Sequence, residues 1–162
     1  MKTLDSLLAR PDSRLVLLGV GNPLRGDDGA GPELILRLRN CTEATLFDCE
    51  EVPENFLGEI VKTNPKTVVI IDAVNLGMSP GDVAVLEEDS FAALGWSTHH
   101  ASLRPLIKYL KANTASDVFV LGIQPKSTEL GSKVSDEVRQ TLDLLQRLIT
   151  TNSVSGKSRH PR

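Results

Sequence analysis

The stretch from Leu15 to Pro32 reads LVLLGVGNPLRGDDGAGP, and it decides how the rest of the chain is interpreted. Its first six residues form a continuous apolar run, which is typical of a strand buried on both faces of a parallel sheet. A loop rich in glycine and aspartate follows from Gly21 to Gly31. Pro32 favours the first turn of a helix, where no amide hydrogen is needed. The order of strand, loop and helix predicts the start of an α/β fold.

The same alternation continues along the chain. Four further apolar or β-branched runs predict strands at 44–47, 67–71, 83–86 and 118–121. Helical spacing or capping signals predict helices from Pro53, over 103–110 and from Ser135. No helix is predicted between Asp72 and the 83–86 strand, so that strand is expected to run antiparallel. The sequence therefore predicts a three-layer α/β/α sandwich around a mostly parallel five-stranded sheet with one antiparallel strand.

Length and charge limit what the protein can be. Its 162 residues predict a single domain over 1–150, followed by a disordered basic tail over 151–162. The tail holds three of the 18 basic residues and no acid, so the body keeps 15 basic against 21 acidic residues, a net charge of −6. Such a body disfavours binding to nucleic acid or to an anionic membrane.

Other sequence features point to location and assembly. The N-terminus lacks the apolar segment of a signal peptide, and no apolar run is long enough to span a bilayer. We therefore expect a cytoplasmic protein. No obvious self-association face is present, so a monomer is expected. Cys41 and Cys49 have neither metal-knuckle nor redox spacing and are expected to be reduced and structural.

The candidate site follows from the predicted sheet. Ligands of such folds bind beyond the carboxyl ends of the strands, where the glycine loop, the segment 48–51, Asp72 and the segment 122–125 are expected. The loop has the glycine spacing of a phosphate-binding loop, but Asp27 and Asp28 stand where lysine and a hydroxyl residue should follow. Two carboxylates repel a phosphate and attract a cation. The residues thus predict a cation site rather than a nucleotide site.

A mixed nitrogen and oxygen ligand set is available for that cation. Asp28 and Asp72 could supply two carboxylates, and His99 or His100 an imidazole, since His160 lies in the predicted tail. One imidazole with two carboxylates resembles sites for Fe, Ni, Zn or Mn. Structural roles remain open at this point. Asp72 could accept loop or helix-cap hydrogen bonds, Asp27 could cap the following helix, and the histidines could be solvent-exposed.

Five stretches can be compared with known families: 19–32 (GVGNPLRGDDGAGP), 53–55 (PEN), 71–73 (IDA), 97–99 (STH) and 121–125 (LGIQP). In this order they resemble the motifs of the hydrogenase maturation proteases, in the branch that processes hydrogenases of the formate hydrogenlyase type. The resemblance covers 15–150. It implies an endopeptidase that removes the C-terminal extension of a [NiFe]-hydrogenase large-subunit precursor after nickel insertion. The nickel would come with the precursor and be recognised by the protease.

The resemblance also assigns roles to residues. By motif position, the nickel ligands would be Asp28, Asp72 and His99, and the two aspartates would be the catalytic residues. Glu54 and Gln124 are candidates either for contact with the substrate or for a structural role. His100 differs from the residue expected there, which leaves open the choice between the two histidines.

Two alternatives are weighed against this interpretation. A nickel chaperone that does not cut its client could use the same three ligands. A peptidyl-tRNA hydrolase-like enzyme also begins with a strand and a Gly-x-Gly-Asn-Pro turn, but that family shows a Thr-Arg-His-Asn stretch where this chain has 27–30 (DDGA). The acidic body also fits poorly with binding to tRNA.

Overall fold

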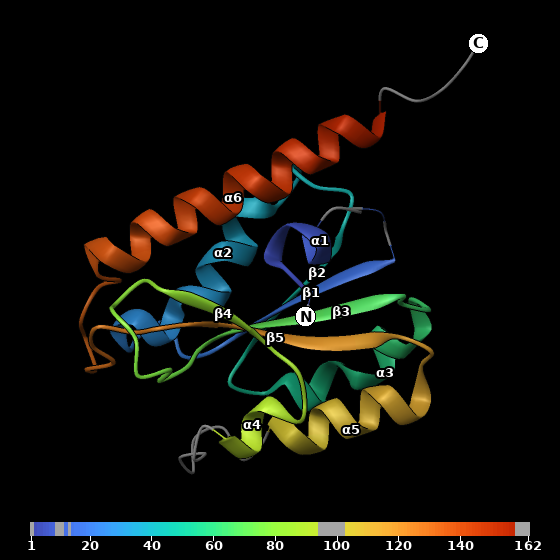
Figure 1. The fold of residues 1–162 in the computed structure, drawn as a ribbon, viewed down its shortest axis with the longest axis horizontal. Helices are drawn as coiled ribbons and strands as arrows, with labels where there is room; N and C mark the ends of the chain where they lie inside the picture. The colour runs from blue at the N-terminus through green and yellow to red at the C-terminus, as the bar shows by residue number, and fades with distance from the viewer. Residues whose placement is uncertain (1, 9–11, 13, 94–102, 158–162) are drawn as a thin grey trace.

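A five-stranded sheet forms the centre of the molecule in the computed structural model, which describes residues 2–8, 12, 14–93 and 103–157 (Figure 1). The strand order is β2-β1-β3-β5-β4. The strands are β1 (Leu15–Val20), β2 (Thr45–Glu50), β3 (Thr67–Ala73), β4 (Val83–Leu86) and β5 (Asp117–Ile123). All neighbours are parallel except β4, which pairs antiparallel with β5. The predicted sheet, including its antiparallel strand, is confirmed.

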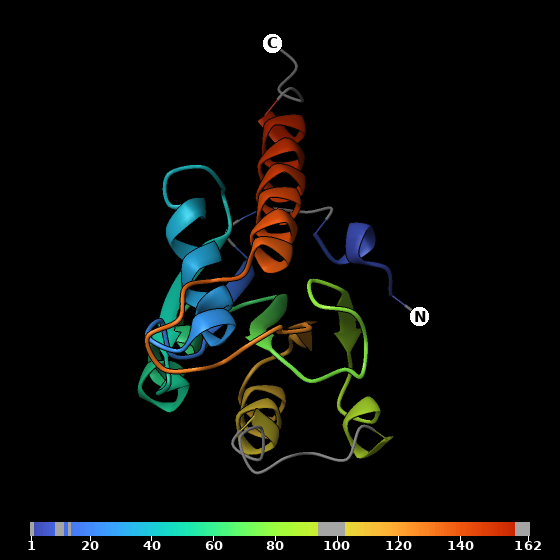
Figure 2. The same ribbon diagram turned by 90° about the vertical axis from the view of Figure 1, so that its left-hand side faces the viewer.

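Helices cover both faces of the sheet (Figures 1 and 2). On one face lie α1 (Leu4–Leu8), α2 (Ala30–Leu38) and α6 (Asp136–Lys157), and on the other α3 (Leu57–Lys62), α4 (Ser90–Ala93) and α5 (Leu103–Asn113). Successive residues of β1 face alternate layers: Leu17 packs in the core with α2 and α6, and Leu18 in the core with α3 and α5. This double burial explains the continuous apolar run that predicted the strand.

Several boundaries differ from those predicted. The helix expected to open at Pro32 begins at Ala30, after the 3₁₀ helix η1 (Gly26–Gly29), so Pro32 still lies in the first turn. The helix expected from Pro53 begins as the 3₁₀ helix η2 (Pro53–Phe56) and becomes α3 only at Leu57. The short helices α1 and α4 were not predicted.

The structure continues α6 to Lys157, through the first seven residues of the segment predicted to be a disordered tail. Once a helix is nucleated, each added residue gains a hydrogen bond for the ordering of one residue, so a packed helix extends readily into polar sequence. Residues 158–162 lie outside the described residues. Within the described ranges, no helix combines the length and apolar character needed to cross a membrane.

The four parallel strands all end at the same edge of the sheet, which we call the carboxyl edge (Figure 2). Four connections leave the strands there: η1 and its loop after β1, residues 51–56 after β2, residues 74–82 after β3, and residues 124–135 after β5. The sequence candidates Asp28 and Asp72 are both at this edge.

Candidate active site

Two glycines bring the glycine loop onto the carboxyl edge. At Gly21, φ is 138°, and a Cβ atom would lie 1.8 Å from the carbonyl oxygen of Asp28. At Gly31, a Cβ atom would lie 2.3 Å from the carbonyl oxygen of Ile71 in β3. Only glycine permits either contact. The backbone carrying Asp28 is therefore folded back on the end of β1, and the start of α2 lies directly against β3.

The two carboxylate oxygens of Asp28 differ in their hydrogen bonding to the described residues. Its side chain is half-buried, and Asp28 Oδ2 accepts a hydrogen bond from the backbone N–H of Asn22 at 2.9 Å. No described residue donates a hydrogen bond to Asp28 Oδ1. The backbone contact fixes the orientation of the carboxylate, and the second oxygen is left available to a ligand or to water.

Asp72 lies at the end of β3, next to the strand that precedes Asp28. It is 4% exposed and pairs in register with Gly122 of β5. Its side chain follows the alternation of Val68 and Ile70, which pack on the α5 side of the sheet. Asp72 is therefore a buried carboxyl group near the carboxyl edge, where ligands of such folds bind.

The predicted histidine ligands, His99 and His100, lie outside the described residues. So does His160. The described helix that follows, α5, begins at the carboxyl edge and covers the same face of the sheet as Asp72 (Figure 1). In the part of the chain that the structure describes, no three His, Cys, Asp or Glu side chains form a group that could hold a metal.

Asp27 has a structural role, although not the expected one. It is 1% exposed, and its carboxylate accepts hydrogen bonds from the backbone N–H groups of Ser135 at 2.7 Å, Lys126 at 2.8 Å and Ser127 at 3.3 Å. The Ser135 hydroxyl also donates to it at 2.9 Å. The sequence suggested a cap on the following helix, but the α2 N-cap is Gly29 and has no side-chain hydrogen bond. Asp27 instead ties η1 to the start of α6.

A third carboxylate, that of Asp48, lies at this edge in β2. It is next to Gly19 in the register of β1 and β2. Asp48 Oδ1 is buried, and it has no hydrogen-bond partner among the described residues. The sequence placed Asp48 at the edge but gave it no role, because a missing partner cannot be read from sequence. Such an oxygen is costly to bury and is a candidate for contact with substrate or water.

Cys49 is unsuited to act as a nucleophile. It is 1% exposed, and burial, with the charges of Asp48 and Glu54 adding to it, raises the pKa of its thiol to about 12. Only the thiolate is nucleophilic, so this cysteine stays inert near neutral pH. Cys41 is exposed, and both cysteines are free. The expectation that they are reduced and structural holds for the buried Cys49.

Of the two residues with undecided roles, Gln124 is structural. It is 8% exposed, and Gln124 Oε1 accepts hydrogen bonds from the backbone N–H groups of Leu76 at 2.6 Å and Met78 at 3.3 Å. The side chain therefore holds the loop between β3 and β4 against the end of β5. Glu54 is exposed in η2, so it remains accessible to a partner.

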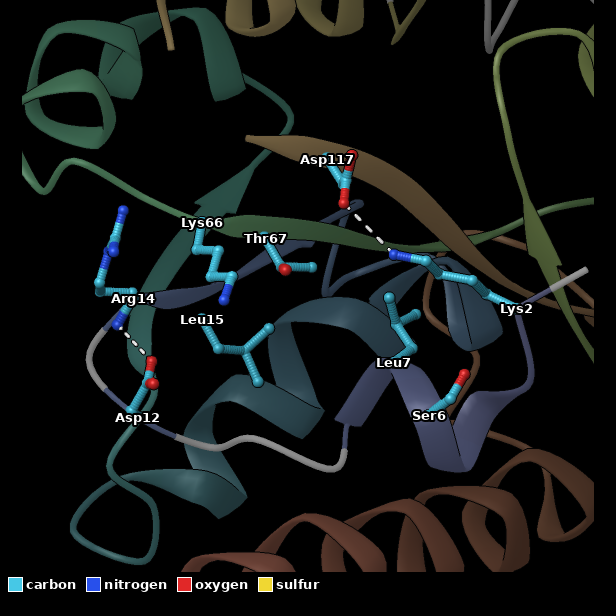
Figure 3. A pocket seen from close by; sticks show the side chains of 9 residues that line it. All are labelled: Lys2, Ser6, Leu7, Asp12, Arg14, Leu15, Lys66, Thr67 and Asp117. Atoms are coloured by element: carbon cyan, nitrogen blue, oxygen red, sulfur yellow. Dashed lines mark hydrogen bonds and ion pairs between the residues drawn. The ribbon is translucent and has the colours of Figure 1, made fainter. Parts of the chain in front are cut away.

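One cavity lies far from these acids, at the amino ends of the strands (Figure 3). It has a volume of about 220 Å³, and its lining includes Lys2, Arg14 and Asp117. Lys2 Nζ and Asp117 Oδ2 form an ion pair at 3.3 Å, with both side chains about half exposed or more. Because the cavity is at the opposite edge of the sheet, it takes no part in the arrangement of Asp28 and Asp72.

Comparison with known proteins agrees with the motifs. Residues 33–152 match the family model of the hydrogenase maturation proteases. The hydrogenase 3 maturation protease of Escherichia coli K12 is 37% identical over 116 residues, which are 68% of this chain and 72% of that protein. The crystal structure of a [NiFe] hydrogenase maturation protease from Thermococcus kodakarensis superposes with a TM-score of 0.85 at 29% identity, covering 94% of this chain and 99% of that one. A solution structure of an endopeptidase from Escherichia coli gives a TM-score of 0.75 at 32% identity over 83% and 88% of the two chains. Family, relatives and fold agree, and the chain belongs to the hydrogenase maturation proteases, which are peptidases.

Proposed function

We propose that this protein removes the C-terminal extension of a [NiFe]-hydrogenase large-subunit precursor, and that it recognises the nickel already bound in that precursor. Asp28, Asp72 and His99 would contact the metal. The family assignment supports the peptidase activity and the class of substrate. The observation that supports the rest is the position of the two acids: Asp28 lies in η1, whose backbone is folded back against the end of β1, and Asp72 lies near the end of the adjacent strand β3.

The donor chemistry fits a metal delivered by the substrate. Nickel accepts imidazole and carboxylate ligands alongside thiolates. Asp28 presents one oxygen that no described residue uses, while its other oxygen is held by Asn22. Two carboxylates and one imidazole leave further coordination positions to be filled by groups of the precursor. An enzyme with such an incomplete set would discriminate between precursors that carry nickel and those that do not.

The cleavage itself requires a water molecule, a base and a polarised carbonyl. Water attacks the carbonyl carbon of the scissile peptide bond, a carboxylate accepts the proton, and the C–N bond then breaks as its nitrogen is protonated. The metal bound in the substrate can polarise the carbonyl or lower the pKa of the water. Asp28 and Asp72 are the proposed catalytic residues. The buried thiol of Cys49 offers no covalent route.

The test is the intact mass of a nickel-loaded large-subunit precursor before and after incubation with the protein. A single loss of a C-terminal peptide, absent with nickel-free precursor, is expected. Unchanged mass with a precursor that a known maturation protease cleaves would favour the nickel-chaperone alternative. Cleavage of both precursors would disprove the proposed recognition of nickel.

Variants connect the activity to individual residues. Asp28→Asn, Asp72→Asn and His99→Ala should each abolish processing while the protein stays folded, as checked by circular dichroism. Asp117→Asn is the matched control, because it changes a strand-terminal carboxylate at the opposite edge that is 67% exposed. It should retain full activity. Complete cleavage by any of the three site variants would remove that residue from the proposed site.

A further inference from the structure

Exposed apolar side chains gather at the carboxyl edge. Among the described residues, seven large apolar side chains are exposed, and four of them lie in the four connections that leave the parallel strands. Scattered exposed apolar residues are ordinary, whereas a group on one edge marks an interaction surface. The four are Leu24 after β1, Val52 after β2, Met78 after β3 and Leu130 after β5, and we call them the apolar rim.

Leu24 and Leu130 are the two most exposed residues of the rim, and their segments adjoin. Each is 68% exposed. The backbone N–H of Gly131 donates a hydrogen bond to the carbonyl oxygen of Leu24 at 2.8 Å, so the two leucine-bearing segments are joined. The same pair of segments is fastened by the buried carboxylate of Asp27, which precedes Asp28 in the chain. The two segments that carry the apolar pair are thereby tied to each other next to η1, which contains Asp28.

Charge is distributed unevenly along this edge. The chain has no lysine or arginine from Asn40 to Val61, a stretch that includes β2, η2 and most of α3. Glu50 at the end of β2 is exposed, and so are Glu51 and Glu54 in the connection after it, on either side of Val52. A partner that covers the rim must therefore present basic side chains to this connection, because uncompensated acids would oppose docking.

We propose that the apolar rim docks on the large-subunit precursor, against an apolar surface with basic side chains opposite the connection after β2. The docking proposal rests on the proposed function. It adds that the protease recognises a protein surface of the precursor as well as the metal. The rim residues lie in the connections that leave β1, β2, β3 and β5 at the same edge as Asp28 and Asp72, so contact with them would bring the precursor to that edge. Apolar contact supplies affinity, and the acids set the orientation.

The test compares rates of processing over a range of concentrations of nickel-loaded precursor. The double variant Leu24→Gln with Leu130→Gln should raise the half-saturating precursor concentration about tenfold or more and leave the maximal rate within about twofold. The matched control is Leu36→Gln with Leu144→Gln, since these leucines are 50% and 62% exposed on α2 and α6, away from the rim. The control should behave like the unmodified protein.

A second double variant, Glu51→Gln with Glu54→Gln, tests the charge of the partner. It should raise the half-saturating concentration about threefold or more at low salt and reduce the salt dependence of processing. A lower half-saturating concentration would show that the docked surface is not basic.

The outcomes separate the two proposals. If the unmodified protein does not cleave nickel-loaded precursor, the proposed function fails and the docking proposal with it. If it cleaves and the leucine double variant has unchanged kinetics, only the docking proposal is overturned. Dissociation of a dimer by that variant, with unchanged kinetics, would identify a second copy of this chain as the occupant and likewise overturn it.

Discussion

Replacement of Asp27 should destabilise the protein strongly, although this residue is not assigned to the chemistry. The Asp27→Ala variant removes a buried carboxylate that accepts four hydrogen bonds, three from backbone N–H groups and one from the Ser135 hydroxyl. Hydrogen bonds to a charged group contribute about 1.5–3 kcal/mol each, and an unpaired buried donor costs about 1–3 kcal/mol. These terms do not add fully, since the loop can relax and water can enter.

We expect a loss of about 3–5 kcal/mol for Asp27→Ala, which is a large share of the roughly 5–15 kcal/mol typical of a domain. Asp27→Asn should lose about half as much, because the amide oxygen can still accept hydrogen bonds while its NH₂ group faces other donors. The measurement is urea unfolding. With a slope near 2 kcal/mol per molar urea, the alanine variant should unfold at about 1.5–2.5 M less urea.

The matched control is Asp136→Asn, whose side chain is 82% exposed and forms a surface ion pair with Arg139 in its own helix. It should change stability by no more than about 0.5 kcal/mol. In Asp27→Ala, the amide hydrogens of Lys126 and Ser135 should also exchange faster, because their acceptor is gone. An unfolding midpoint within about 0.3 M of the unmodified protein would refute the reasoning, since a slope near 2 makes this less than 1 kcal/mol.

Three further predictions concern Cys49 and Gly21. Native protein treated with iodoacetamide at pH 8 should gain one adduct, on Cys41, and Cys49 should react only after unfolding, as mass spectrometry of a digest would show. Because the unfolded thiol titrates near 9.0 and the folded one at about 12, Cys49 should cost no stability below pH 9 and up to roughly 1.4 kcal/mol per pH unit between 9 and 12. Urea midpoints at pH 8 and pH 10 for the unmodified protein and Cys49→Ala measure this difference. Gly21→Ala should cost at least about 2 kcal/mol and slow processing, because its Cβ would displace the backbone of Asp28.

The sheet could be predicted from the sequence because its signals are local. The runs in β1, β3 and β5 are apolar on both faces, and glycine or aspartate closes them. The helices α1 and α4 could not be predicted, because five and four residues are too few to show a period of 3.6. Such helices are held by tertiary contacts rather than by propensity.

The candidate site was predictable only in part, because some of its contacts depend on tertiary structure rather than on local sequence. Parallel strands bring their carboxyl ends together, so the sequence could place Asp28 and Asp72 at one edge. The bond between Asp27 and Ser135 joins residues 108 positions apart, and the contact of Gln124 with Leu76 spans 48. Neither separation leaves a pattern in the sequence, since these contacts depend on where loops meet in space.

Adjacent aspartates can serve opposite purposes because their environments differ. Asp27 is fully enclosed and its carboxylate is occupied by donors from the connection after β5, so it has nothing left to offer a ligand. Asp28 is half-buried, and among the described residues only the backbone N–H of Asn22 donates to its carboxylate, which fixes one oxygen and leaves the other without a described donor. The hydrogen bonds of Asp27 hold the backbone that carries Asp28. The proposed contact of Asp28 with a metal held by another protein would be favoured by a rigid backbone, because binding energy spent on ordering a loop would be lost from recognition. The buried aspartate supplies that rigidity to the exposed edge.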